Sequence, residues 1–211
     1  MSETRLTSPV SDDVLRIADY SFLRRDASAT KHTGMAVYVH ETIRVFTSRP
    51  FDLEFVHVES IWLQVKTGRG PPIFLAFIHR NPSSSFVWFD EFARMTDKVR
   101  DHKHTNDILL LGDLDMFKSN PAWASTLSLF NLHQCVQSAT RVTLRTPALI
   151  DHIYVNDPNK MIRTYVPDAS ISDHNPVYCA LYCKVPKPKN RKTHDCNAQV
   201  LQKRQCRCFS Q

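Results

Sequence analysis

The sequence contains the stretch ILLLGDLD at residues 108–115, in which an apolar run ends at Gly112 and two carboxylates follow. In extended backbone, residues two apart point to the same side, so Asp113 and Asp115 could converge at the C-terminal end of a strand. Two adjacent carboxylates repel each other unless a positive charge lies between them. Mg²⁺ or Mn²⁺, which take oxygen ligands, would supply that charge. The alternative is a strand followed by an Asp-rich turn, and this stretch alone favours neither.

Two later stretches carry related chemistry, ISDHNPV at 171–177 and LIDHIYV at 149–155. In the first, Asp173 precedes His174, and a histidine near neutrality can donate a hydrogen bond to a phosphate oxygen. In the second, Asp151 interrupts a strand-like run, where a carboxylate needs a partner such as His174. The alternatives are a polar loop that enters a strand and a carboxylate that faces water from a half-exposed strand.

The length and composition suit one globular domain with a tail. The chain has 211 residues, of which 42% are hydrophobic and 23% are charged. The longest apolar run, residues 73–78, is too short to span a bilayer, and the N-terminus lacks the apolar stretch of a secretory signal. We therefore expect an intracellular protein, nuclear or cytoplasmic, with no membrane partner and no small-molecule cofactor.

The positive charge of the chain is concentrated at its C-terminal end. The net charge is +6, yet residues 184–211 contain eight Lys or Arg and a single Asp. We place the domain boundary near Lys184, with a domain over 1–183 and a basic, disordered tail over 184–211. Such a tail can hold nucleic acid without sequence preference, or it can be a solvated end. The tail cations predicted to bind nucleic acid are Lys187, Lys189, Arg191 and Lys192.

The six cysteines are expected to be free thiols in a reducing compartment. A zinc cluster is the other interpretation of His194, Cys196, Cys206 and Cys208, but no paired C-x2-C spacing supports it.

The pattern of apolar residues predicts a chain dominated by strands. Strands are expected at 35–39, 61–66, 73–79, 107–111, 134–137, 149–155, 162–166 and 177–183. Helices are expected at 86–100, capped by Ser84 or Ser85, and near 121–130 with Pro121 in its first turn. This mixture predicts an α+β sandwich of packed sheets with peripheral helices.

Seven short stretches in order match one family. They are SETRL at 2–6, GMAVYV at 34–39, ESIWL at 59–63, RNPSS at 80–84, TRVT at 140–143, LIDHI at 149–153 and ISDH at 171–174. Over about residues 3–188 the chain resembles the endonuclease/exonuclease/phosphatase superfamily, and more closely the endonuclease domain of non-LTR retrotransposons. The resemblance implies a four-layer α/β sandwich with two central β-sheets, DNase I-like. It also implies hydrolysis of phosphodiesters in DNA with Mg²⁺ or Mn²⁺.

The resemblance assigns roles to individual positions. Glu3 would be a metal ligand, and Asp173 would support the metal site or hold the histidine. Asp113 would orient or deprotonate the attacking water, and Asp115 would help to place that water and the phosphate.

The remaining roles concern the phosphate and the DNA. Asp151 would orient His174, and His174 would bind the scissile phosphate. The positions expected to contact DNA within the domain are Arg80, Asn81 and Arg141.

Three departures from the family pattern bear on activity. The chain begins almost at the Glu-Thr motif, so we expect the first strand, with its active-site Asn, to be lacking, and a sheet edge to be exposed. Asp115 stands where the family usually has Asn, and the loss of such a donor can cost on the order of 100-fold in rate. His79 replaces the Tyr that usually precedes Arg-x-Pro, and it can still donate a hydrogen bond.

Three functions therefore compete. The first is a metal-dependent DNA endonuclease, active or weakened. The second is a catalytically dead retroelement-derived fragment or nucleic-acid-binding pseudoenzyme. The third is a phosphatase of the same superfamily, which the retrotransposon-like stretches disfavour.

Overall fold

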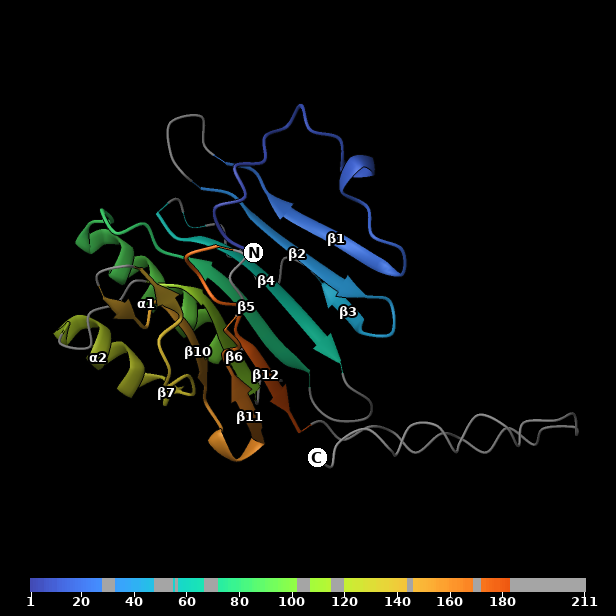
Figure 1. Cartoon of the computed structure of the whole chain (residues 1–211). Helices are drawn as coiled ribbons and strands as arrows, with labels where there is room; N and C mark the ends of the chain where they lie inside the picture. Colours follow the sequence, from blue (N-terminus) through green and yellow to red (C-terminus); the bar gives the residue numbers. More distant parts are fainter. Residues whose placement is uncertain are drawn as a thin grey trace, which may run out of the picture.

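The computed structural model describes residues 1–27, 33–47, 55, 57–66, 72–101, 107–114, 120–143, 146–168 and 172–182. The N-terminal elements are η1 (Asp12–Leu15), β1 (Tyr20–Arg25), β2 (Met35–His40), β3 (Arg44–Thr47), β4 (Glu59–Lys66) and β5 (Ile73–His79). Then follow α1 (Phe86–Arg100), β6 (Asp107–Asp113), α2 (Pro121–Leu129), β7 (His133–Gln134), β8 (Arg141–Val142) and β9 (Pro147–Ala148). The last are β10 (Asp151–Val155), η3 (Pro158–Lys160), β11 (Met161–Tyr165) and β12 (Tyr178–Leu181) (Figure 1).

A six-stranded sheet forms the centre of the molecule, in the order β3-β4-β5-β6-β10-β7. Strands β5 and β6 pair in parallel, and the other pairs are antiparallel. A parallel pair needs a crossover connection, which α1 supplies. Together, α1 and α2 cover one face of this sheet (Figure 1).

The helix α1 has the bounds that the sequence predicts, because its apolar residues recur at helical spacing. Trp88, Phe92, Met95 and Val99 are buried on one side and pack on Phe74 and other residues of the sheet. Ser85 occupies the N-cap position as expected, yet its side chain forms no capping hydrogen bond. The first turn of α1 therefore lacks a side-chain cap.

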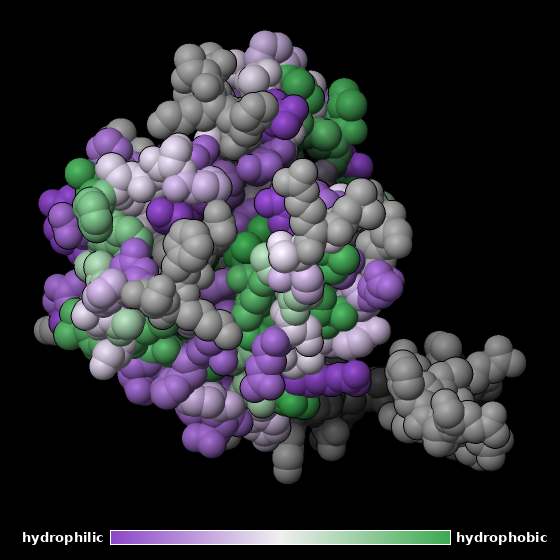
Figure 2. Space-filling view, turned by 60° about the vertical axis from the view of Figure 1, so that its left-hand side comes forward, coloured by the Kyte–Doolittle hydropathy of each residue, from purple (hydrophilic) through white to green (hydrophobic). Residues whose placement is uncertain are grey.

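The opposite face of the central sheet is covered by two hairpins. The β1–β2 pair packs on one part of the sheet, and the β11–β12 pair packs on another. Leu75 contacts both apolar clusters, so the two cores are continuous beneath the hairpins. The face shown in Figure 2 carries an apolar strip (green) bordered by polar residues (purple). The predicted α+β, DNase I-like fold class is confirmed. Among the described residues, the second β-layer consists of two separate two-stranded sheets, β1–β2 and β11–β12.

Several details differ from the sequence-based expectations. The predicted strand at 134–137 is only the two-residue β7, and β1 and β3 were not predicted. Cys135 and Cys179 are free thiols. Among the described residues, no helix has the length and apolarity needed to cross a bilayer. The predictions for Asp115 and for the tail, 184–211, lie outside the described residues.

Candidate active site

The site is built where β5 and β6 end side by side. A Cβ on Gly112 would lie 1.6 Å from the carbonyl oxygen of Ile78, so only glycine permits the two backbones to come this close. The N–H of Arg80 donates to the carbonyl of Asp113 at 2.9 Å, and the N–H of Leu114 donates to Ile150 at 3.0 Å. The backbone at Asp113 and Leu114 is therefore held by the segments on both sides of β6.

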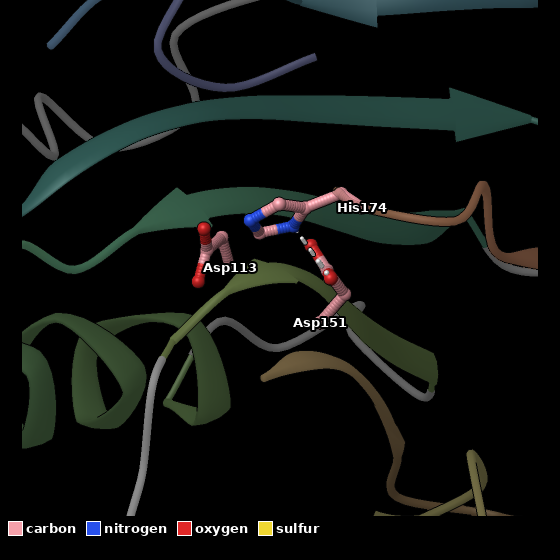
Figure 3. A group of neighbouring side chains, drawn as sticks. All are labelled: Asp113, Asp151 and His174. Atoms are coloured by element: carbon pink, nitrogen blue, oxygen red, sulfur yellow. Dashed lines mark hydrogen bonds and ion pairs between the residues drawn. The ribbon is translucent and has the colours of Figure 1, made fainter. Parts of the chain in front are cut away.

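Three predicted residues meet at this edge. One ligand atom from each of Asp113, Asp151 and His174 lies within 4.8 Å of those of the other two. Asp113 and Asp151 are paired residues of the neighbouring strands β6 and β10. The Nδ1 of His174 lies 3.0 Å from Oδ2 of Asp151, and the imidazole lies between the two carboxylates (Figure 3).

Thr140 holds two of these residues in place. It is fully buried, and its hydroxyl oxygen accepts hydrogen bonds from the N–H groups of Ile150 and Asp151, at 3.1 and 2.9 Å. Its carbonyl accepts from the N–H of Asn175, directly after His174, at 2.7 Å. One residue thus connects the backbone of Asp151 to the loop that carries His174.

The electrostatics of this group favour a shared proton or a bound cation. Burial, followed by the charge of Asp151, raises the pKa of Asp113 to about 6. The hydrogen bond to Asp151 raises the pKa of His174, although partial burial opposes this. A carboxylate whose pKa lies near neutrality is suited to exchange protons during a reaction.

A second carboxylate–histidine pair lies on the other side of Asp113. Nδ1 of His79 lies 2.7 Å from Oε2 of Glu59, and Oε1 of Glu59 accepts from the N–H of Gly34 at 2.6 Å. His79 is only 2% exposed. Burial works against its charged form, but the hydrogen bond and charge of Glu59, with the charge of Asp113, outweigh it and raise the pKa of His79.

Glu3 lies beside this second pair. Its Oε1 is 3.6 Å from Nε2 of His79. The N–H of Thr4 donates to Gly34 at 3.0 Å, and Gly34 has φ of +104° with space only for hydrogen, since a Cβ would lie 2.7 Å from Thr4 Oγ1. Glu3 is absent from the three-residue group around Asp113, although its charge contributes to the raised pKa of Asp113.

The other predicted residues take different positions. The Oδ2 of Asp173 accepts from Nε of Arg141 at 2.8 Å, and this bond lowers the pKa of Asp173. Both side chains are about half exposed, and neither belongs to the group around Asp113. The guanidinium of Arg80 lies over the rings of Trp88 and Phe89, at 5.8 and 5.5 Å.

Asn81 shapes the turn that precedes α1. Its Oδ1 accepts from the N–H and the hydroxyl of Ser83, at 2.9 and 2.6 Å. This turn brings the start of α1 beside His79. Asn81 and His79 therefore line the same cavity.

The donor set at this edge fits a hard divalent cation. Asp113 and Asp151 supply carboxylate oxygens, which Mg²⁺ and Mn²⁺ prefer, and the burial of Asp113 leaves its charge poorly solvated. Nδ1 of His174 is engaged by Asp151, and among the described residues its Nε2 forms no hydrogen bond, so Nε2 could donate to a phosphate oxygen.

Comparisons with known proteins address the fold. No family model matches the sequence, and no curated protein matches it. The structure is similar to the endonuclease domain of TRAS1, a telomere-specific non-LTR retrotransposon, with a TM-score of 0.59 and 14% identity over 76% of this chain and 77% of that chain. The chain has the fold of the endonuclease/exonuclease/phosphatase proteins.

Two further structures share this fold. TDP2 from D. rerio, complexed with a single-strand DNA product, has a TM-score of 0.56 and 12% identity over 79% of this chain and 78% of that chain. A mannosyl-6-phosphatase from Bacteroides thetaiotaomicron has a TM-score of 0.53 and 17% identity over 79% of this chain and 78% of that chain. The fold therefore hosts action on both nucleic acids and small phosphorylated molecules.

Sequence reasoning missed Glu59 and Thr140 as members of the site. Glu59 is the register partner of His79 on β4 and β5, so pairing the two predicted strands in the correct register would have found it. Thr140 begins the TRVT stretch of the family resemblance, but it carries no charge and acts through hydrogen bonds to backbone groups, so the sequence did not indicate its role in the site.

Proposed function

We propose that this chain is a metal-dependent phosphodiesterase that cleaves DNA internally. The observation that supports this best is the group of Asp113, Asp151 and His174 at the edge of the sheet. It combines a carboxylate of raised pKa, a carboxylate-bound imidazole and a donor set suited to a divalent cation.

The roles of the side chains follow from their surroundings. Asp113 orients the attacking water beside the cation that it would help to hold. Asp151 holds Nδ1 of His174, which directs the second nitrogen of the imidazole toward Asp113 (Figure 3). The protonated imidazole then donates to a phosphate oxygen and stabilises the charge that develops there.

A divalent cation would be held by Asp113 and Asp151, with the charge of Glu3 nearby. When bound, Mg²⁺ or Mn²⁺ supplies Lewis-acid polarisation of the phosphate and neutralises the crowded carboxylates. His79, held by Glu59, lies 3.6 Å from the carboxylate of Glu3 on the side of Asp113 away from His174.

DNA is proposed as the substrate on two grounds. The seven stretches resemble the endonuclease domains of retrotransposons, and similar structures include a TRAS1 endonuclease domain and TDP2 with a DNA product. The mannosyl-6-phosphatase of the same fold makes a small phosphomonoester the competing substrate.

The test is the nicking of supercoiled plasmid by the purified full chain, in Mg²⁺, in Mn²⁺ and in EDTA. We expect nicking with either metal and none in EDTA. Asp113→Asn and His174→Ala should abolish it, whereas Asp90→Asn removes an equivalent charge from the exposed side of α1 and should not.

Three other outcomes have defined meanings. A folded wild-type chain that binds plasmid in EDTA but never nicks it is a nucleic-acid-binding pseudoenzyme. Hydrolysis of p-nitrophenyl phosphate without nicking would make the chain a phosphatase. A gain in nicking by Asp115→Asn would show that the acid at this position weakens a functional enzyme.

A further inference from the structure

The polar cavity that His79 and Asn81 line lies next to the proposed active site. It has a volume of about 530 Å³, and its walls include Arg25, His57, Asn81, Ser84 and Trp88. His79 and Glu59 also line it, so the cavity is continuous with the pair that flanks Asp113. This volume falls within the range of ligand-binding pockets, which is roughly 300–1,000 Å³.

Among the described residues of the cavity wall, Arg25 is a cation without a carboxylate partner. Nη1 of Arg25 donates to the carbonyl of Val58 at 3.1 Å, and in the part of the chain that the structure describes it forms no ion pair. The two acids of the wall are engaged elsewhere. Asp26 lies 3.1 Å from Nε of Arg24, and Glu59 binds His79 and the N–H of Gly34. The guanidinium of Arg25 can therefore pair with an anion in the cavity.

The start of α1 adds hydrogen-bond donors. Ser84 and Ser85 line the cavity, and Ser85 is the N-cap of this 15-residue helix without forming a side-chain cap. The first N–H groups of a helix have no partner within the helix, and they carry its positive partial charge. Such a helix end attracts anions.

We propose that this cavity binds a backbone phosphate of the polynucleotide, adjacent to the scissile phosphate. Arg25 pairs with the phosphate, and the N–H groups at the start of α1 donate to its oxygens. This assignment rests on the proposed function for its choice of polynucleotide. The same chemistry could recognise free inorganic phosphate, so the test separates the two sources.

The experiment measures binding rather than turnover. A fluorescein-labelled single-stranded oligonucleotide is titrated with the full chain in EDTA, and fluorescence anisotropy gives the Kd. We expect Arg25→Ala to raise the Kd about 5–10-fold. The slope of log Kd against log salt concentration should also fall by the amount that corresponds to about one phosphate contact. Arg16→Ala is the matched control, because Arg16 is exposed and lines a different cavity. Its Kd should stay within about twofold of wild type, as expected for a surface charge.

A second variant protects the test from a loss of folding. Ser85→Asp places a carboxylate at the N-cap, where Asp is a favourable cap, so its Tm should equal or exceed that of wild type. The same carboxylate repels a phosphate in the cavity, so the Kd should rise several-fold. If Ser85→Asp has a higher Tm and binds the oligonucleotide more weakly, misfolding cannot account for the weaker binding.

Chemical substitution of the DNA identifies the phosphate itself. Oligonucleotides with one neutral methylphosphonate, placed in turn at each linkage, are bound to wild type and to Arg25→Ala. We expect one linkage at which the methylphosphonate weakens wild type but has no further effect on Arg25→Ala, which is the signature of a direct pair.

The outcomes separate this proposal from the proposed function. Equal Kd values for Arg25→Ala and Arg16→Ala, or no coupled linkage, overturn the phosphate site even if nicking is observed. Coupling at one linkage supports the site even if the chain never nicks plasmid. Inorganic phosphate that binds in an Arg25-dependent manner, with no coupled linkage, would assign the cavity to free phosphate instead.

Discussion

The two carboxylate–histidine pairs around Asp113 have the same composition and different surroundings. The Glu59–His79 pair is enclosed, with the histidine side chain 2% exposed and its second nitrogen directed at Glu3. The Asp151–His174 pair is open, with the histidine side chain 32% exposed and its second nitrogen beside Asp113 (Figure 3). The difference indicates that access, rather than the pair itself, decides which histidine could reach the scissile phosphate in the proposed reaction.

The largest effect should come from the open pair. We expect His174→Ala to lower the rate of nicking about 100–1,000-fold, because it removes a donor to the developing charge. Its Tm should change little, since the side chain is partly exposed. His79→Ala should instead lower the Tm by several degrees. Equal loss of Tm in both variants would contradict the distinction between the pairs.

The enclosed pair should show the next largest effect, on stability. Glu59→Ala leaves the N–H of Gly34 and the buried His79 without their partner, which should cost ~3 kcal/mol. Because the pKa of His79 is raised in the folded protein, its stabilising effect is present below the unfolded pKa and is lost as the pH rises through the folded pKa. Urea unfolding at several pH values should therefore show a larger loss at acid pH. If the loss of stability in Glu59→Ala does not vary with pH, the protonated His79 does not contribute to it.

Asp113, between the two pairs, should show a smaller effect of defined pH dependence. Its pKa rises from 3.8 to about 6 on folding, so the folded state binds more protons between these values and stability falls as the pH rises through this window. The difference corresponds to at most ~3 kcal/mol, and access to water reduces it, so we expect ~1–2 kcal/mol. Asp113→Asn in EDTA should be more stable than wild type at pH 7.5, and this gain should vanish below pH 3.8. A gain in stability of Asp113→Asn that does not vary with pH would contradict the raised pKa of Asp113.

The smallest effect should come from Arg141→Ala. Its ion pair with Asp173 is about half exposed on both sides, and exposed pairs contribute little. We expect the Tm to stay within measurement error and the rate of nicking to fall only a few-fold. A complete loss of nicking would place Arg141 and Asp173 in the catalytic machinery beside the open pair.

Much of the fold could be predicted where the burial pattern is regular. The apolar spacing of α1 and the nearly continuous apolar run of β5 correspond directly to their buried positions. The strand β1 was not predicted because Arg24 and Arg25 stand at its end, and two adjacent charges interrupt the apolar pattern by which a strand is recognised. In the structure, Arg24 pairs with Asp12 and Asp26, so these charges belong to the hairpin.

The site was predictable only in part, for a related reason. Asp113, Asp151 and His174 each stand in a stretch whose local sequence indicates a polar residue at a strand end. Glu59 depends on the register of two antiparallel strands, and Thr140 depends on contacts between segments that lie 10 and 35 residues apart in sequence. Such relations arise from tertiary packing, and a linear pattern does not contain them.

The contact between Gly112 and Ile78 has a consequence for engineering. Because peptide backbones touch there, the spacing of His79 and Asp113 is set by two main chains rather than by the packing of side chains. Directed evolution of a more heat-resistant chain could therefore repack the residues beneath α1 while leaving the spacing of the two residues unchanged. Selection for a different cation at the proposed metal site would, in contrast, have to act on the side chains, since the backbones of the two strands have no room to move closer.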